Sequence, residues 1–207
     1  MGTPIPQNQC EFTPLEAAEA CHGRWSGTPL TRIRGVSIDT RTIASGELFV
    51  ALRGLGADGH AYLDQAAARG AAAAIVETGR SHSQLACIEV PDTLVALGAL
   101  ARHHLARARA ARTLPVLAIG GAAGKTTTKE LTAALSRAIF GDTLSTPGNL
   151  NNRIGVPMTI LTLGGTHRAA VLECGTNTRG EIARLAQIVE PDSAMILNVD
   201  LEHTEGL

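Results

Sequence analysis

The chain has 207 residues, of which 44% are hydrophobic, 18% are charged and 2% are aromatic, and its formal net charge is -1. This apolar content excludes a disordered chain, and the balanced charge gives no basic footprint for a general nucleic-acid binder. So few aromatic residues also leave no stacking surface for single-stranded nucleic acid. We expect a folded α/β protein that binds no nucleic acid and has a core of Ala, Val, Ile and Leu.

We expect neither a targeting signal nor a membrane span. Residues 1–10 lack a basic start followed by an apolar stretch, and no apolar run approaches the roughly 20 residues that cross a bilayer. The four cysteines lie far apart without a CxxC pair, which does not favour a zinc site or a disulfide framework. We therefore expect a cytoplasmic protein with reduced thiols and no membrane insertion.

The first hundred residues predict a small α/β domain. Residues 13–16 (TPLE) place a hydroxyl at the N-cap, a proline at the first helical position and a glutamate at the third, which is typical of a helix start. Strands are predicted over 33–39, 47–52, 71–77 and 86–90, and a helix over 60–69. A long helical pattern then begins at Asp92 and leads to a domain boundary at residue 112.

Beyond Pro115 the pattern alternates strictly between strands and helices. Strands are predicted over 116–119, 142–146, 169–174 and 193–199, and helices over 126–140, 154–163 and 180–189. Repeated β-α-β units with apolar strands predict a doubly wound parallel sheet, and ligands gather at the carboxyl ends of such strands. We therefore expect two domains, residues 1–112 and residues 113–207.

A glycine-rich turn between the first of these strands and its helix has the features of a phosphate-binding loop. Small residues let backbone N–H groups approach phosphate oxygens, and the helix N-terminus adds positive potential. Lys125 can reach the β- and γ-phosphates, and Thr126 can hold Mg²⁺. Because Ile119 stands where a literal GxxxxGK[ST] pattern has glycine, a plain strand-to-helix turn is the alternative. The candidate nucleotide ligands are Gly121, Ala122, Ala123, Gly124, Lys125, Thr126 and Thr127.

Other polar residues follow later strands of the same predicted sheet. Glu173 ends one strand and His203 lies shortly after the next, so both would share the sheet edge of the loop, where they could bind Mg²⁺. Taken singly, a surface acid and a solvent-facing histidine are the ordinary interpretations. Residues 146–152 (TPGNLNN) carry amides that can bind hydroxyls, carbonyls and phosphates, although such turns are usually only turns.

Together these segments resemble the Mur ligases. The resemblance rests on residues 121–130, 146–159, 173–182 and the segment from Asn198 to Gly206, although the family usually has Ser or Thr where Ala122 stands. Upstream, the segments SIDTR, GELFVAL and DGH, at 37–41, 46–52 and 58–60, are similar to the uridine-nucleotide-binding N-terminal domain of that family. The Asn-rich run is similar to that of the members that add a dipeptide.

The resemblance implies an ATP- and Mg²⁺-dependent ligase of peptidoglycan synthesis. Its substrates would be UDP-N-acetylmuramoyl-tripeptide, activated as an acyl phosphate, and D-alanyl-D-alanine, whose amine attacks that intermediate. The catalytic residues implied are Lys125, which would hold phosphates, Glu173, which would bind Mg²⁺ with Thr126, and His203, which would help bind a second Mg²⁺. Substrate contacts would come from Asn149, Asn152, Thr40 and Arg41, the last two near the UDP moiety.

The resemblance also implies that relatives continue beyond the segment seen here. They have the rest of the central domain and a C-terminal Rossmann-like domain, so we expect residues 113–207 to form an incomplete P-loop ATPase domain behind a UDP-binding one. One alternative is a non-catalytic fragment that binds nucleotides or UDP-sugars. A folate-polyglutamating ligase would lack the front domain, and a general P-loop kinase or GTPase leaves the Asn-rich run unexplained.

Overall fold

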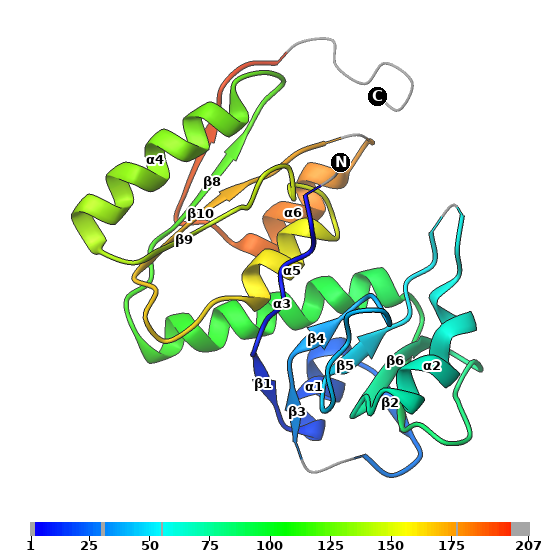
Figure 1. Cartoon of the computed structure of the whole chain (residues 1–207). Coiled ribbons are helices and arrows are strands. Elements are labelled where there is room, and N and C mark those ends of the chain that lie inside the picture. Colours follow the sequence, from blue (N-terminus) through cyan, green and yellow to red (C-terminus); the bar gives the residue numbers. More distant parts are fainter. Residues whose placement is uncertain (1–2, 30–31, 55, 177, 200–207) are drawn as a thin grey trace. The chain divides into compact units, whose positions relative to one another are not determined.

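The structure is a computed structural model that describes residues 3–29, 32–54, 56–176 and 178–199 (Figure 1). The chain divides into two compact units: Gln7–Leu100 forms one, and Met1–Pro6 with Ala101–Leu207 forms the other. This division falls inside helix α3 (Thr93–Ala111), whereas the sequence pattern puts the domain boundary at residue 112, just past the end of that helix.

The first unit contains a five-stranded sheet. Its strand order is β2-β7-β6-β5-β4, and the strands are β2 (Arg24–Ser26), β4 (Val36–Ser37), β5 (Leu48–Val50), β6 (Ala73–Glu77) and β7 (Cys87–Val90). Strand β2 runs antiparallel to β7, and the other pairs are parallel. This unit also contains the antiparallel pair β1 (Glu11–Phe12) and β3 (Ile33–Arg34), the helices α1 (Pro14–Cys21) and α2 (Leu63–Ala68), the short 3₁₀ helix η1 (Gly59–Tyr62) and the first part of α3.

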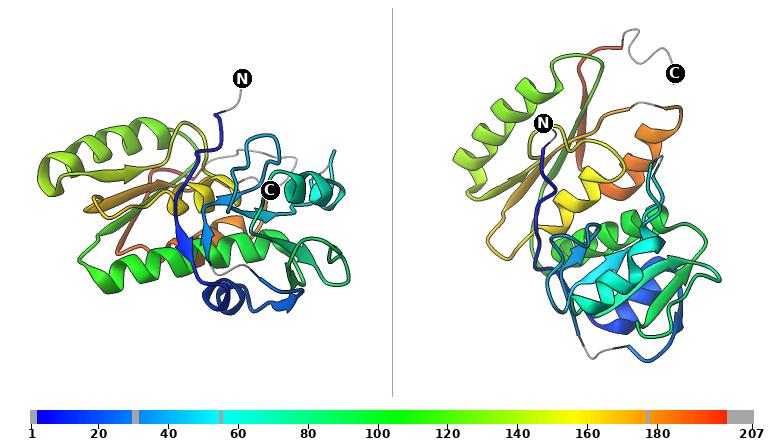
Figure 2. Two further views of the ribbon diagram at one scale, coloured as in Figure 1. Left: turned by 60° about the horizontal axis from the view of Figure 1, so that its bottom comes forward. Right: turned by 45° about the vertical axis from the view of Figure 1, so that its right-hand side comes forward.

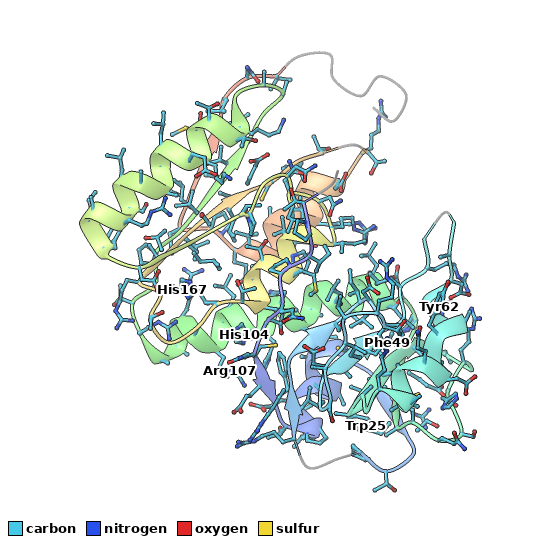
Figure 3. The ribbon with its side chains drawn as sticks, viewed as in Figure 1. Trp25, Phe49, Tyr62, His104, Arg107 and His167 are labelled. Atoms are coloured by element: carbon cyan, nitrogen blue, oxygen red, sulfur yellow. The ribbon has the colours of Figure 1, made fainter. Side chains whose placement is uncertain are left out.

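Alternation along the strands builds two apolar layers in this unit. Phe49 and Val76 pack with Leu63 and Ala66 of α2 in one buried cluster. Because neighbouring strand residues point to opposite faces, Leu48 and Ile75 lie on the other side of the sheet. Figure 3 shows Phe49 among the strands, while Tyr62 reaches the surface. Both faces of the parallel strands are therefore covered, as the apolar strand sequences predict.

Local signals placed most elements of this unit correctly. The capping box at Thr13 is confirmed, because its hydroxyl accepts from Glu16 N (3.2 Å) and the Glu16 carboxylate accepts from Thr13 N (2.7 Å). The single strand predicted over 33–39 is wrong: Gly35 has φ +89° and separates β3 from β4. Strands β1 and β2 were not predicted, because two or three residues are too short to display a period.

The second unit is built on a four-stranded, entirely parallel sheet. The order is β11-β8-β10-β9, with β8 (Val116–Gly120), β9 (Thr143–Ser145), β10 (Ala169–Glu173) and β11 (Ser193–Ile196). Helix α4 (Lys125–Phe140) covers one face, and α5 (Gly155–Leu161) and α6 (Glu181–Val189) lie on the other (Figures 1 and 2). The predicted doubly wound parallel sheet is thus confirmed, with β8 and β10 at its centre.

Polar contacts join the last turns of α3 to this sheet. His104 is buried, and its Nε2 lies 2.9 Å from the carbonyl oxygen of Leu163, just past α5. Arg109 donates to the Asp192 carboxylate, whose other oxygen accepts from Val116 N (2.8 Å) at the start of β8. These contacts fix the amino-terminal end of the sheet and leave the carboxyl end for the glycine-rich turn.

All four cysteines are buried and free. Burial raises the pKa of both Cys21 and Cys174 to about 12. None of the helices in the described ranges combines the length and the apolarity that a bilayer crossing requires.

Gly59 and Gly56 differ in the space around them, so alanine substitutions at these positions test how closely the chain packs around η1. A Cβ at Gly59 would lie 2.8 Å from backbone atoms of Ala51 and Leu52, whereas one at Gly56 meets open space. We expect Gly59→Ala to lower the free energy of unfolding by about 1–3 kcal/mol, because backbone must shift to admit the methyl group. Gly56→Ala should stay within about 0.5 kcal/mol of the parent.

Urea denaturation followed by fluorescence measures the difference, since the only tryptophan, Trp25, lies in the same unit. Equal midpoints for the two variants would show that the backbone around residue 59 yields freely.

Candidate nucleotide-binding site

The glycine-rich turn leaves β8 and enters α4 at the carboxyl edge of the sheet. Gly121 and Gly124 have φ values of +128° and +82°, which favour glycine. A Cβ at Gly121 would also lie 3.0 Å from the backbone nitrogen of Leu197, in the segment that follows β11. The turn therefore requires glycine for its shape, and it packs against the end of the neighbouring strand.

Backbone and side-chain donors converge inside this turn. The Lys125 ammonium donates to the carbonyl oxygens of Gly121 (2.7 Å) and Ala122 (2.5 Å). Ala122 N and Ala123 N donate to the backbone and side-chain oxygens of Asn198, at 3.1 and 2.9 Å. The first N–H groups of α4 have no acceptor within the helix and add its positive dipole end. An anion with several oxygens, such as a polyphosphate, suits this arrangement.

The Glu173 carboxylate stands beside the turn. It ends β10, pairs in register with Ile119 of β8, and is 1% exposed. One carboxylate oxygen accepts from Thr126 Oγ1 (3.0 Å), and the other accepts from Asn151 Nδ2 (2.7 Å). The Glu173 backbone N–H donates to Thr146 Oγ1 (2.9 Å). The sequence placed Thr126 and Glu173 at one sheet edge, and the structure brings their side chains into contact.

These oxygens form a donor set that fits Mg²⁺. Hydroxyl and carboxylate oxygens are the hard ligands that this ion takes, together with phosphate oxygens and water. In the described ranges no three His, Cys, Asp or Glu side chains gather into a metal-binding group. An ion beside Thr126 and Glu173 would therefore depend on a nucleotide for further ligands, as is usual for Mg²⁺ at phosphate sites.

The asparagines of the Asn-rich run form hydrogen bonds with different partners. Asn149 accepts from Thr3 Oγ1 (2.8 Å), and Asn152 accepts from Ile154 N (3.0 Å) and Gly155 N (2.8 Å) at the start of α5. The family resemblance implies substrate contacts for Asn149 and Asn152. In the structure, the amide that contacts Glu173 is that of Asn151. A turn has no period, so the sequence does not tell which of adjacent amides points to the site.

The other candidates lie apart from this edge or outside the described ranges. In the first unit, Thr40 is buried and donates to Gln65 Oε1 (2.5 Å), while exposed Arg41 contacts the Asp39 carboxylate at 2.6 Å. The hydrogen bond from Arg41 lowers the pKa of Asp39. Thr127 is exposed in the first turn of α4. His203 falls outside the described residues.

Comparison with known proteins identifies the family. Residues 32–139 match the catalytic domain of the Mur ligase family, and residues 119–207 match the Mur ligase middle domain. The chain belongs to the Mur ligase family. UDP-N-acetylmuramoyl-tripeptide--D-alanyl-D-alanine ligase of Haemophilus influenzae is 38% identical over 199 residues, which cover 95% of this chain and 43% of that protein.

Solved structures of Mur ligases agree in fold. The UDP-N-acetylmuramoylalanyl-D-glutamyl-2,6-diaminopimelate--D-alanyl-D-alanyl ligase of Acinetobacter baumannii is 36% identical and superposes with a TM-score of 0.84, over all of this chain and 45% of that one. The MurF ligase of Thermotoga maritima in complex with ADP is 33% identical, with a TM-score of 0.69 over 79% of this chain and 37% of that one. The chain thus spans less than half the length of these relatives.

Adjacent asparagines give a matched test of the Glu173 contact. Asn151→Asp would place a second carboxylate against buried Glu173, whereas Asn152→Asp keeps an acceptor oxygen for the N–H groups of Ile154 and Gly155. We expect Asn151→Asp to cost about 1–3 kcal/mol of stability at pH 7.5, because an amide donor is lost and like charges meet. Asn152→Asp should be nearly neutral.

The stability of Asn151→Asp should depend on pH, because its new carboxylate would lie beside that of Glu173. Their repulsion raises a carboxyl pKa in the folded state, so the penalty of Asn151→Asp should shrink as the pH falls and one group takes up a proton. Denaturation at pH 7.5 and pH 5, followed by circular dichroism, checks this. Equal stability of both variants at both pH values would remove Asn151 from the site.

Proposed function

We propose that this chain serves in the ATP-dependent addition of D-alanyl-D-alanine to UDP-N-acetylmuramoyl-tripeptide, a cytoplasmic step of peptidoglycan precursor synthesis. The observation that carries the proposal is the contact of Thr126 and Glu173 beside a glycine-rich phosphate loop. The names of its Haemophilus and Acinetobacter relatives support the choice of substrates. The ADP in the Thermotoga relative supports the assignment of ATP as the phosphoryl donor.

The chemistry requires transfer of the γ-phosphoryl group to the terminal carboxylate of the tripeptide. The dipeptide amine then attacks the acyl phosphate carbonyl, and inorganic phosphate leaves as the amide forms. Both steps need neutralised phosphate charge and close alignment of the reacting groups. Mg²⁺, when bound, neutralises phosphate oxygens. Lys125 would leave its loop carbonyls to bind the β- and γ-phosphates, with the backbone N–H groups around Gly124 as further donors.

The other residues are assigned by their place in the chain. Thr126 and Glu173 would hold one Mg²⁺, and His203 would help to bind a second. Residues 113–207 would form the ATP-binding domain and residues 1–112 the UDP-binding domain, with Thr40 and Arg41 near the UDP moiety. Asn149 and Asn152 would contact substrate once their present hydrogen bonds to Thr3 and to the start of α5 exchange.

Replacement of the loop lysine tests nucleotide binding. We expect Lys125→Ala to remove most of the thermal stabilisation by Mg-ATP without lowering the melting temperature of the nucleotide-free chain, because this ammonium serves ligand charge rather than core packing. Arg137→Ala is the matched control, since it removes a cation from the exposed last turn of the same helix. A full Mg-ATP shift in Lys125→Ala would reject the phosphate-binding role.

The choice of substrate is tested by titration of the same chain. We expect UDP-N-acetylmuramoyl-tripeptide to bind and a folate to leave the melting temperature unchanged, because the first unit is assigned to uridine nucleotides. Release of ADP is then measured with both substrates present and with the dipeptide omitted. Release that depends on the dipeptide supports the ligase, whereas binding without such release supports a non-catalytic nucleotide-binding role.

A further inference from the structure

A lysine occupies a place on α4 where an apolar residue would be expected. Lys129 lies three positions after Thr126 and four before Ala133, so the three lie along one side of the helix, and Lys129 and Ala133 are its buried residues. Ala133 joins a core cluster with Ile119 and Val171, and Lys129 itself is 0% exposed. Burial of an ammonium is costly unless its protons are bound, so specific acceptors must compensate for it.

Two acceptors meet the buried ammonium. Lys129 Nζ donates to the carbonyl oxygen of Thr146 (2.8 Å) and to the Glu130 carboxylate (2.6 Å). Glu130 is mostly exposed, with 59% of its side chain accessible, so water competes for its charge. The contact with Thr146 is fully buried, and it joins α4 to the first residue after β9.

Thr146 connects Lys129 to the candidate site, because it is hydrogen-bonded to both Lys129 and Glu173. Its hydroxyl accepts from the Glu173 backbone N–H (2.9 Å), and its own N–H donates to Val171 O (3.2 Å) on β10. At 1% exposure, Thr146 thus uses its carbonyl, hydroxyl and N–H to join α4, the end of β9 and the end of β10. Removal of the ammonium would leave the carbonyl of this junction buried without its charged donor.

We propose that Lys129 is a positioning residue that holds Glu173 toward Thr126 through Thr146. It touches no nucleotide in this assignment, and its effect on Mg²⁺ binding is exerted through the orientation of the Glu173 carboxylate. Groups that orient metal ligands in this way commonly change metal affinity by about 10–100-fold when removed. The assignment rests on the proposed nucleotide function only for that effect, because the Lys129–Thr146–Glu173 connection is a property of the nucleotide-free chain.

The test uses Lys129→Met, which keeps the length of the side chain without a donor, and Thr146→Val, which keeps its shape without the hydroxyl. Glu130→Gln is the control, because it weakens the exposed partner and leaves the Lys129–Thr146 contact in place. The first measurement is amide hydrogen exchange at Glu173 in the nucleotide-free 207-residue chain. We expect exchange at least about tenfold faster in Lys129→Met and in Thr146→Val, and within about twofold of the parent in Glu130→Gln.

The second measurement is the ratio of ADP affinities with Mg²⁺ and with EDTA. That ratio should fall about 10–100-fold in Lys129→Met and in Thr146→Val, with little change in the Mg²⁺-free affinity. The double variant should be no worse than either single one, because the two changes interrupt the same connection. A general loss of stability would not reproduce this pattern, since it would weaken ADP binding with and without Mg²⁺ alike.

Each result decides between the two claims. Parental exchange at Glu173 together with a parental Mg²⁺ ratio in Lys129→Met overturns the positioning role. If the parent chain shows no Mg²⁺-dependent ADP binding, the proposed nucleotide function fails, while the exchange measurement still decides the role of Lys129. If Lys129→Met does not fold, Thr146→Val decides alone, because slow exchange and a parental ratio there overturn the connection equally.

Discussion

The hydrogen bonds around the Glu173 carboxylate hold together three segments that are distant in sequence. A buried carboxylate must have donors, and here they come from the first turn of α4 at Thr126 and from the Asn-rich run at Asn151. Strand β10 sets the position of this side chain along the sheet, because Glu173 pairs in register with Ile119 of β8. The carboxyl edge of the sheet is therefore shaped by the need to satisfy one acid, and the glycine-rich turn lies beside it.

Parallel topology explains why these segments meet. Each strand of the second unit returns through a helix, so every loop that follows a strand arrives at the same edge. With β8 next to both β10 and β11, the glycine-rich turn stands between Glu173 on one side and Asn198 on the other. The contribution of Asn198 is a pair of acceptors that order the turn, a role that no side-chain pattern in the sequence indicates.

The spacing of apolar residues and the positions of turn residues predicted most of the fold and part of the candidate site. Alternating strands and helices predicted the parallel sheet, and the residues before Lys125 predicted a glycine-rich turn between strand and helix, because both depend on local chemistry. The direction of the Asn151 amide and the burial of the Lys129 ammonium are set by packing between segments that are distant in sequence. Local sequence patterns therefore do not reveal them. Gly35 shows the same limit, since its left-handed φ interrupts an alternation that otherwise reads as one strand.

The buried thiols make this protein convenient for site-specific labelling. With a pKa of about 12, Cys21 and Cys174 stay protonated near neutral pH, and a protonated, enclosed thiol reacts slowly with electrophiles. Cys10 and Cys87 are likewise buried. A cysteine introduced at an exposed position, such as Ala123 in the glycine-rich turn, would carry a fluorophore or spin label without prior removal of the native ones.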